Sequence, residues 1–409
     1  MIKAAVVGVT GFGGTHYNDL IREYEAGRVQ PVAAVVINPE EAAEKVAKLQ
    51  KIGCDILPDF DTLIAKYAGK VDICCIPTGI ALHKPMSVAA VEAGFNVFVE
   101  KPVAATVAEV NEMTAAAKKN GKFIAVGFQN MYQSETLRIK EILLSGMIGK
   151  PQSFKCYAMW PRHFAYYNRN KWAGRILGGN GEAILDSPFT NALAHDLNLQ
   201  LFYAGTTMEE MADVVSVQSV LMRANNIESC DTASIKCITS NGCELLFNVT
   251  HAANCLIHPL HIIKCENGEL HTNRAFSMCK VFDKEGNLLE EVPFDTNPRN
   301  NIWTAMIDRV NGKNAFICTP EMAGIHTLVS NAAFDSSPVI DFPEELISTV
   351  TFDETGVERR VVRGIEKILR RTFDENRLFN EDDFSFVRPG KIIDLKQYNG
   401  FQNIQGYSK

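Results

Sequence analysis

The sequence predicts an α/β protein in which a doubly wound parallel sheet is followed by a second, α+β domain with an open, mainly antiparallel sheet. Up to about residue 130, short apolar strand patterns alternate with helical patterns, which is typical of a parallel sheet covered by helices. Beyond residue 214, strand patterns follow one another with only short turns between them, which indicates an antiparallel meander. The length of 409 residues leaves room for both domains.

The composition is that of an ordinary globular protein, with 46% hydrophobic residues, 22% charged residues and a formal net charge of −7. No run of lysine and arginine stands out, so we expect a small-molecule partner and no nucleic acid. No apolar window reaches the ~18 residues of a membrane span, and no secretory leader precedes the first strand, so we expect a cytoplasmic protein without membrane contact. The eleven scattered cysteines show no zinc spacing and no disulfide framework; we expect buried thiols and no metal site.

The first predicted strand ends in a glycine-rich turn. The turn contains five candidate cofactor-binding residues, Gly8, Thr10, Gly11, Phe12 and Gly13. Gly8, Thr10 and Gly13 match G-x-G-x-x-G with threonine at the middle glycine position, a motif that brings the backbone close to a pyrophosphate at a helix N-terminus. Because Thr10 adds a Cβ atom, a tight strand-to-helix turn without a ligand is the alternative.

The second predicted strand, residues 32–37, ends without the acidic residue that usually holds the adenosine ribose. Asn38 is the polar group at this position, and we expect it to contact the cofactor. The first cation downstream that could hold a 2′-phosphate is Lys45. The sequence therefore favours NAD, with NADP possible.

A later strand, residues 95–99, leads into Glu100, Lys101 and Pro102. Its continuous apolar run suits a strand that is buried on both faces of a parallel sheet. Ligands bind at the carboxyl edge of such sheets, and Pro102 favours an extended Lys101. We therefore expect Lys101 at a ligand crevice; a surface lysine at the end of a strand is the alternative.

The order of the glycine turn, residues 76–78 with His83, and then Glu100-Lys101-Pro102 resembles the glucose-fructose oxidoreductase, inositol dehydrogenase and MocA (Gfo/Idh/MocA) family from residue 1 to about 130. The resemblance implies a Rossmann domain that binds a nicotinamide dinucleotide, and a second domain that covers the nicotinamide and binds a sugar or cyclitol. It also implies a homodimer or homotetramer, formed through one face of the second sheet. Further cofactor-binding residues implied by it are Pro77, Thr78, His83, Glu100 and Lys101.

Residues 178–195 look like the second signature of this family, with one difference. The family has an aspartate and a histidine four residues apart, whereas this chain has Asn191 and His195. With Ser187 as N-cap and Pro188 at the first helical position, both side chains would lie on one helix face and reach one bound hydroxyl. A histidine buried in the core is the alternative for His195.

An asparagine cannot accept a proton, so catalysis falls to other groups. We expect Lys101 to take the proton of a substrate hydroxyl, with its pKa lowered by burial and by the positive nicotinamide ring. We expect His195 to hydrogen-bond the same oxygen and relay its proton outward, and Asn191 to complete the catalytic group as a hydrogen-bonding residue. Asp186 and Glu182 are less favoured carboxylate substitutes.

Residues 160–175 mix aromatic side chains with arginine and asparagine. Aromatic faces cover the C–H patches of sugars, and arginine donors bind their hydroxyls. We therefore expect Tyr167, Arg169 and Trp172 to bind substrate together with Asn191 and His195. An aromatic loop at a subunit interface is an equal alternative.

The remaining elements complete the expected domain plan. We expect strands at 214–222, 230–239, 243–251, 260–265 and 277–282, and helices at 301–310, 320–334 and 356–371. We divide the chain into a Rossmann domain (1–128), a substrate-binding and oligomerisation domain (129–337) and a C-terminal extension or arm (338–409).

The sequence thus predicts an NAD(P)-dependent dehydrogenase that acts on a secondary hydroxyl of a sugar, glycoside or cyclitol. A glycoside-cleaving enzyme that uses tightly bound NAD in a transient oxidation is one alternative. A non-catalytic dinucleotide-sensing regulator is another, which the presence of both Lys101 and His195 disfavours, because a sensor needs neither.

Overall fold

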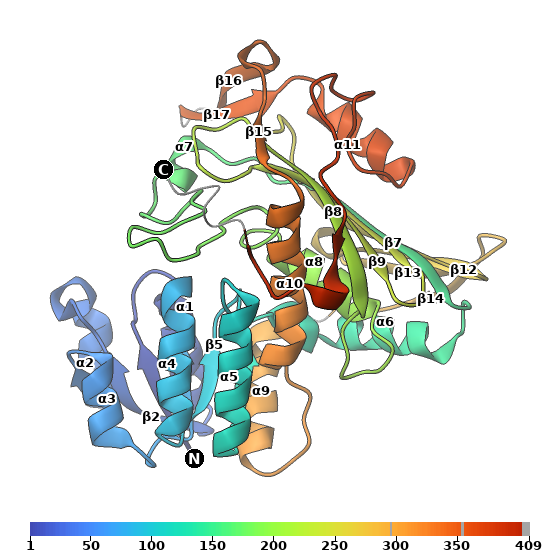
Figure 1. Cartoon of the computed structure of the whole chain (residues 1–409). Coiled ribbons are helices and arrows are strands. Elements are labelled where there is room, and N and C mark those ends of the chain that lie inside the picture. The colour runs from blue at the N-terminus through green and yellow to red at the C-terminus, as the bar shows by residue number, and fades with distance from the viewer. Residues whose placement is uncertain (295–296, 353–355, 403–409) are drawn as a thin grey trace. The chain divides into compact units, whose positions relative to one another are not determined.

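The computed structural model describes residues 1–294, 297–352 and 356–402. The chain forms two compact units, one of Met1–Tyr132 with Asn297–Gly324 and one of Gln133–Thr296 with Ile325–Lys409 (Figure 1). Residues Asn297–Gly324 therefore belong to the first unit, although the sequence analysis placed them in 129–337. None of the described helices is long and apolar enough to cross a membrane.

The first unit contains a six-stranded parallel sheet with the strand order β3-β2-β1-β4-β5-β6. The strands are β1 (Ile2–Val7), β2 (Val29–Val35), β3 (Asp55–Leu57), β4 (Ile73–Ile76), β5 (Asn96–Val99) and β6 (Ile124–Val126). Its helices are α1 (Gly13–Glu25), α2 (Ala43–Lys51), α3 (Phe60–Tyr67), α4 (Ile80–Glu92), α5 (Val107–Asn120) and α9 (Pro298–Val310), and α10 (Pro320–Ser336) begins in this unit. The predicted doubly wound Rossmann sheet is confirmed.

Burial explains why the central strands read as apolar runs. All four residues of β4 have no exposed surface, and the last three residues of β5 are equally buried, as strands covered on both faces require. The following helix, α5, begins with a capping box between Thr106 and Glu109 and ends at Gly121 with a left-handed φ of 60°. Ten of the eleven cysteines are buried, which confirms the prediction of buried thiols.

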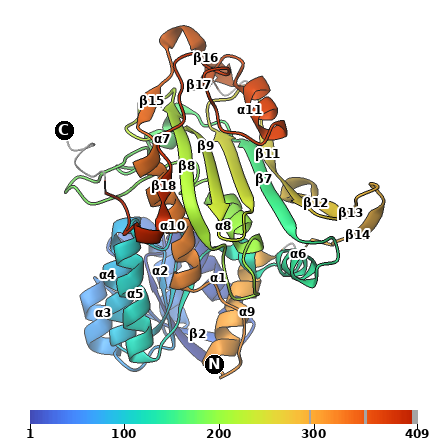
Figure 2. The ribbon, with the colours of Figure 1, turned by 45° about the vertical axis from the view of Figure 1, so that its right-hand side comes forward.

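The second unit contains a ten-stranded sheet with the order β14-β13-β12-β11-β7-β10-β9-β8-β15, and β18 pairs with β8. The strands are β7 (Pro151–Met159), β8 (Val214–Arg223), β9 (Thr232–Thr239), β10 (Glu244–Thr250), β11 (Ile257–Cys265), β12 (Gly268–Asn273), β13 (Met278–Asp283), β14 (Leu288–Glu291), β15 (Val339–Asp341) and β18 (Ile393–Asp394). Within the described strands of this second sheet, only the pairs β7–β10 and β8–β15 are parallel. The predicted open, mainly antiparallel sheet is confirmed, and Figure 2 shows β7, β9 and β8 in this order across it.

Helices α6 (Ser134–Ser145) and α8 (Ala194–Tyr203) are joined by a buried lysine. The ammonium of Lys140 donates to the carbonyl oxygens of Phe202 and Gly205, each at 2.5 Å. Its side chain has no exposed surface, and burial lowers the pKa of Lys140 to about 7. Lys140 thus fixes α6 to the C-terminal end of α8 at one buried point.

The C-terminal segment contains a hairpin and a helix. These elements are β16 (Ile347–Phe352), β17 (Val357–Val362) and α11 (Ile365–Asp374). The helix predicted at 356–371 is therefore wrong in its first half, where β17 contains three valines and pairs with β16. Gly364, with a left-handed φ of 81°, separates the strand from the helix.

The same segment packs on the sheet and is part of the second unit. Its apolar residues Phe342, Val362, Ile365, Leu369, Phe373, Phe379, Phe384 and Val387 share one core with Tyr157, Met159, Val220, Met222 and Leu246 of the sheet. Two polar contacts reinforce this core: Lys155 Nζ donates to Phe373 O at 2.9 Å, and Asn248 Nδ2 donates to Thr372 Oγ1 at 3.0 Å. Part of the apolar sheet face is therefore covered by the chain itself.

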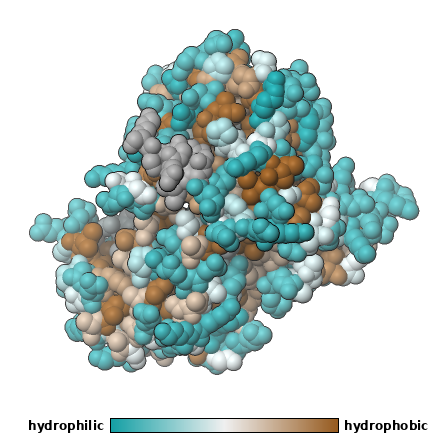
Figure 3. Space-filling model, in the orientation of Figure 1, coloured by the Kyte–Doolittle hydropathy of each residue, from teal (hydrophilic) through white to brown (hydrophobic). Residues whose placement is uncertain are grey.

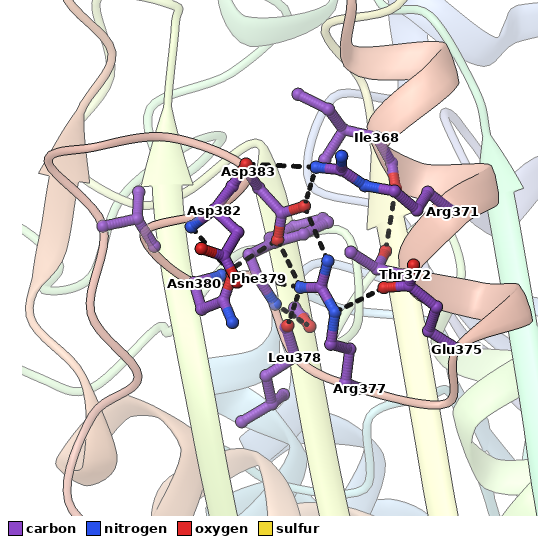
Figure 4. A network of polar contacts seen from close by, with 12 residues as sticks. Ile368, Arg371, Thr372, Glu375, Arg377, Leu378, Phe379, Asn380, Asp382 and Asp383 are labelled. Atoms are coloured by element: carbon purple, nitrogen blue, oxygen red, sulfur yellow. Dashed lines mark hydrogen bonds and ion pairs between the residues drawn. The ribbon is translucent and has the colours of Figure 1, made fainter.

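The turn after α11 is held by a charged network around Asp383 (Figure 4). Its carboxylate has no exposed surface, pairs with Arg371, and lies 2.6 Å from Arg377 Nη1. It also accepts the backbone N–H of Asn380 at 3.0 Å. The opposite side of Arg377 pairs with Glu375 at 2.6 Å.

On the face drawn in Figure 3, hydrophilic residues cover most of the surface and apolar residues form small patches between them.

Replacing Asp383 with asparagine leaves two guanidinium groups without their shared carboxylate. We expect Asp383→Asn to lower the free energy of unfolding by about 2 kcal/mol or more, measured by urea denaturation. The control is Asp382→Asn at the exposed neighbouring position, which should change it by less than ~0.5 kcal/mol. Equal effects of the two substitutions would contradict a structural role for this network.

Candidate functional site

The glycine-rich turn joins β1 to α1 and requires glycine at three positions. Gly8 and Gly11 have left-handed φ values of 94° and 54°, and a Cβ atom at Gly13 would lie 2.6 Å from the carbonyl oxygen of Gly8. Thr10, at the middle glycine position of the motif, is exposed, as is Phe12. Helix α1 begins at Gly13 and has no acidic residue in its first turn. The turn thus presents a helix N-terminus that suits an anion such as pyrophosphate.

The side of the turn next to β2 carries an amide and an ammonium. Asn38 is exposed, and its Nδ2 donates to Glu41 Oε1 at 3.1 Å. Lys45 Nζ donates to the carbonyl oxygen of Val9 at 2.7 Å and lies 5.2 Å from the centre of the Tyr17 ring. The structure therefore places Lys45 beside the glycine turn, which its distance in the sequence does not reveal.

His83 links the loops that follow β4 and β5. Its Nδ1 lies 2.9 Å from Pro102 O and its Nε2 lies 3.1 Å from Thr78 O. The ring is buried, and burial lowers the pKa of His83 despite these carbonyl contacts. Both ring nitrogens face the backbone, so His83 positions the two loops. Thr78 Oγ1 is buried and has no hydrogen-bond partner among the described residues, which suits a hydroxyl that a ligand completes.

The carboxylate of Glu100 forms the centre of a buried charged cluster. Its Oε1 lies 2.8 Å from His16 Nε2 and 3.3 Å from Arg299 Nη1, and its Oε2 accepts the backbone N–H of Lys101 at 3.3 Å. Arg299 also pairs with Asp19 at 2.6 Å. Burial alone would raise the pKa of the Glu100 carboxyl, but His16 and Arg299 outweigh it and hold the pKa at about 2. Glu100 is therefore a permanent anion that fixes structure and cannot act as an acid or base near neutral pH.

Lys101 is the first residue after this anchored carboxylate. Its residue is half-buried, and its peptide bond to Pro102 is cis. It lies at the carboxyl end of β5, the same sheet edge at which the glycine turn follows β1 and Thr78 follows β4. The sheet therefore brings the predicted phosphate turn and the predicted base to one edge of the first unit.

In the second unit, the helix predicted to start at Pro188 starts at Ala194 instead. Ser187 does cap a turn, because its Oγ accepts the N–H of Thr190 at 3.2 Å and also pairs with Thr190 Oγ1 at 2.8 Å. This side-chain pair favours a separate turn before α8. Asn191 therefore lies in the turn, and the half-buried His195 is the second residue of the helix.

Asn191 is engaged with the buried carboxylate of Asp186. Its Nδ2 donates to Asp186 Oδ1 at 2.9 Å and lies 3.4 Å from the Tyr166 hydroxyl. Asp186 Oδ2 accepts the backbone N–H of Gly174 at 2.6 Å. Glu182 lies apart from this group and closes its own turn by accepting the N–H of Asn180 at 2.9 Å. Asp186, the less favoured candidate from the sequence, is the carboxylate that contacts the aromatic segment.

The aromatic segment 160–175 folds around Tyr166. The guanidinium of Arg169 lies 3.8 Å from the centre of the Tyr166 ring and 4.9 Å from that of Trp172. Tyr167 packs edge-on against Tyr166 with a ring separation of 5.2 Å. The structure thus brings Tyr167, Arg169 and Trp172 into one cluster of the second unit.

Sequence reasoning missed three members of the Glu100 cluster. His16 and Asp19 lie on α1, and Arg299 lies on α9. The helical spacing of His16 and Asp19 after the glycine turn places both on one face and could have indicated them. No local signal indicates Arg299, because it lies 199 residues from Glu100. No group of three or more potential metal ligands occurs in the described ranges.

The fold and this sheet edge are those of a Rossmann domain with a glycine-rich turn, the class of domain that binds dinucleotides. Residues 2–128 match the Gfo/Idh/MocA family model, described as an oxidoreductase family with an NAD-binding Rossmann fold. This match lies in the N-terminal domain, and it confirms the resemblance seen in the sequence from residue 1 to about 130.

Two similar proteins are inositol dehydrogenases. Inositol 2-dehydrogenase/D-chiro-inositol 3-dehydrogenase of Halalkalibacterium halodurans is 30% identical over 156 residues, which are 38% of this chain and 43% of that protein. Inositol 2-dehydrogenase of Pseudomonas savastanoi pv. phaseolicola is 29% identical over 223 residues, 54% of this chain and 58% of that protein. The chain thus spans about half the length of these relatives.

Solved structures extend the similarity of the fold beyond the first domain. The WlbA dehydrogenase of Chromobacterium violaceum, in complex with NADH and UDP-GlcNAcA, has a TM-score of 0.65 and 23% identity, covering 82% of this chain and 94% of that one. An NAD-binding oxidoreductase from Klebsiella pneumoniae has a TM-score of 0.68 and 17% identity, covering 82% and 96%. At these identities the comparison establishes the fold.

The Glu100 cluster predicts a specific dependence of stability on pH. The folded-state pKa of Glu100 lies below its ordinary value, so its stabilisation is complete above the unfolded pKa of ~4.3 and is lost as the pH falls toward 2. We expect Glu100→Gln to lower the free energy of unfolding by ~3 kcal/mol at pH 7, with a deficit that shrinks below pH ~4.

Urea denaturation at a series of pH values measures this deficit. The control is Glu92→Gln at an exposed position of α4, which should change the free energy of unfolding by less than ~0.5 kcal/mol at every pH. A deficit for Glu100→Gln that stays constant down to pH 2 would show that its carboxylate is not the stabilising group.

Proposed function

We propose that this protein is an NAD(P)-dependent oxidoreductase that transfers hydride between nicotinamide and a secondary hydroxyl of a sugar or cyclitol. The observation that carries the proposal is the shared sheet edge, at which the glycine turn, Thr78 and Lys101 follow the neighbouring strands β1, β4 and β5. The names of the inositol dehydrogenases support it, because their substrates are cyclitols.

The residues of the first unit fit a nicotinamide dinucleotide. The glycine turn has no side chains at Gly8, Gly11 and Gly13, so a ligand can come close to its backbone. The buried Thr78 hydroxyl has no hydrogen-bond partner among the described residues and can bind the same ligand. We propose that the turn binds the pyrophosphate and that Asn38 and Lys45 lie toward the adenosine ribose. When bound, the cofactor supplies an acceptor for the hydride.

We propose that Lys101 acts as the base in alcohol oxidation. A neutral Lys101 takes the proton of the substrate hydroxyl while the C–H bond of the same carbon breaks. The carboxylate of Glu100 accepts the backbone N–H of Lys101 at 3.3 Å and so holds this part of the backbone in place. We also propose that His195 hydrogen-bonds the substrate hydroxyl. Asn191 would hold the carboxylate of Asp186 in position beside the bound substrate.

A redox-neutral reaction is the second candidate. One relative, 2,7-anhydro-N-acetylneuraminate hydratase of Mediterraneibacter gnavus, is 30% identical over 146 residues, 36% of either chain. Its name describes a reaction without net oxidation. The same residues would then use the cofactor transiently, in agreement with the alternative of a glycoside-cleaving enzyme.

Absorbance of NADH separates the two candidates. We expect the purified protein to form NADH from NAD⁺ with at least one member of a panel of inositols, hexoses and hexose glycosides. Conversion of a panel member without NADH formation would favour the redox-neutral reaction. Failure to bind NADH at all would reject both.

The role of Lys101 predicts a large kinetic effect. Lys101→Met should lower kcat by ~100-fold or more because it removes the proposed base, and it should weaken NADH binding far less than it lowers kcat. The control is Lys119→Met at an exposed position of α5, which should leave kcat unchanged. Retention of wild-type kcat in Lys101→Met would disprove the assignment.

The cytoplasmic location and the homodimer or homotetramer stay predictions from the sequence. The C-terminal segment bears on the oligomer, because its core with β7, β8 and β10 covers part of this sheet, and the resemblance implies subunit contacts through one face of the same sheet. Light scattering of the purified protein measures the number of subunits directly.

A further inference from the structure

Several buried polar atoms near Tyr166 have no hydrogen-bond partner among the described residues. They are both ring nitrogens of His251, the hydroxyl of Tyr167, Trp160 Nε1 and Arg162 Nε. His251 is only 2% exposed. A buried polar atom without a partner is destabilising, so a cluster of such atoms is typical of a site that a ligand completes.

Two of these residues line a small cavity of the second unit. Its walls are Tyr166, Tyr167, Gly174, Asp186, Ser187, Pro188, Cys230 and His251. The cavity has room for about one water-sized group. The Asp186 carboxylate at its wall already accepts hydrogen bonds from the N–H of Gly174 and the amide of Asn191, which compensates its charge. The cavity thus suits a single hydroxyl that meets His251 and Tyr167.

The segment beside this cavity is strongly basic. Residues 160–175 contain four arginine and lysine residues and no aspartate or glutamate, in a chain with a formal net charge of −7. Arg175 pairs with Glu228 at 3.2 Å. Arg162 and Arg169 form no ion pair with any carboxylate of the described ranges.

Aromatic rings hold these two guanidinium groups in place. Arg162 lies 4.8 Å from the centre of the Tyr166 ring and 5.3 Å from that of Trp160, while Arg169 lies 3.8 Å from Tyr166. Stacking fixes the planar groups without neutralising them. Arg162 is partly buried, where a cation without a carboxylate is costly, and Arg169 is exposed beside it; an anionic ligand between them would remove the cost at Arg162.

Burial and the same two cations together determine the protonation state of His251. Burial lowers the pKa of His251 well below its ordinary value, and Arg162 and Arg169 lower it further. The imidazole is therefore neutral, with one donor and one acceptor. A hydroxyl group, which both donates and accepts, satisfies such a ring.

We propose that the substrate is a sugar or cyclitol that carries a carboxylate or a phosphate, with its anionic group bound by Arg162 and Arg169 and one of its hydroxyls bound by His251 and Tyr167. This inference rests on the proposed function and names the class of its substrate. His251 and Arg162 become substrate-binding residues in addition to those that the sequence indicated.

The test compares acidic compounds with their neutral parents. Calorimetry in the presence of NADH measures binding of D-glucuronate, D-galacturonate, glucose 6-phosphate and inositol 1-phosphate, each beside D-glucose, D-galactose or myo-inositol. We expect at least one acid to bind ten times or more as tightly as its parent, with a preference that falls as salt rises. Uronates and sugar phosphates form separate arms, which distinguish a carboxylate from a phosphate.

Two variants separate the anion from the hydroxyl. Arg162→Met should remove most of the preference for the acid, measured as the ratio of the dissociation constants of the acid and its neutral parent, whereas Arg370→Met, at an exposed position of α11, should leave this ratio as in the wild type. His251→Phe should weaken both compounds by the same factor. Unliganded His251→Phe should melt no lower than the wild type, because it removes two buried nitrogens without partners.

The outcomes distinguish this inference from the proposed function. Equal binding of acids and neutral parents, a preference that survives in Arg162→Met, or no binding of any acid would overturn the acidic-substrate inference. If NADH binds and a neutral sugar is oxidised as well as its acid, only this inference fails. If NADH does not bind, the proposed function fails whatever the anions do.

Discussion

The buried carboxylate of Glu100 is the constraint on which the first unit depends. It gathers His16 from α1, Arg299 from α9 and the backbone of Lys101 after β5 around one negative charge. The packing leaves no slack, since a Cβ atom at Gly127 would lie 2.7 Å from Glu100 Oε2. The position of Lys101 relative to the glycine turn therefore follows from electrostatics inside the sheet edge and not from the loop alone.

In the second unit, some buried polar groups have no hydrogen-bond partner among the described residues and are available to a ligand. Its sheet is stabilised on one side by the core with the C-terminal segment, and charged groups there pair fully, as around Asp383. Around Tyr166 the opposite holds, because Arg162, Tyr167 and His251 keep buried atoms without partners. The Asp383 network thus holds structure, whereas the atoms without partners around Tyr166 mark a candidate binding site.

The sequence predicted what depends on local patterns. Both sheets, the glycine turn and the placement of Lys101 at a strand end follow from the periodicity of apolar residues and from turn chemistry. The strand at 357–362 was missed because its charges resemble a helix surface, although pairing with β16 decides its conformation. The contacts of Arg299, Lys45 and His251 could not be predicted from the sequence, since each of these residues packs against residues that are distant along the chain.

The most direct test of the central claim is a fluorescence titration of NADH into the wild type and Gly13→Ala. The added Cβ atom would meet the carbonyl oxygen of Gly8 at 2.6 Å, so we predict that binding falls by ~100-fold or more, a loss of ~3 kcal/mol. Gly179→Ala, where the Cβ atom has open space and no left-handed φ is needed, should bind NADH like the wild type. Undiminished binding by Gly13→Ala would contradict a dinucleotide site at this turn.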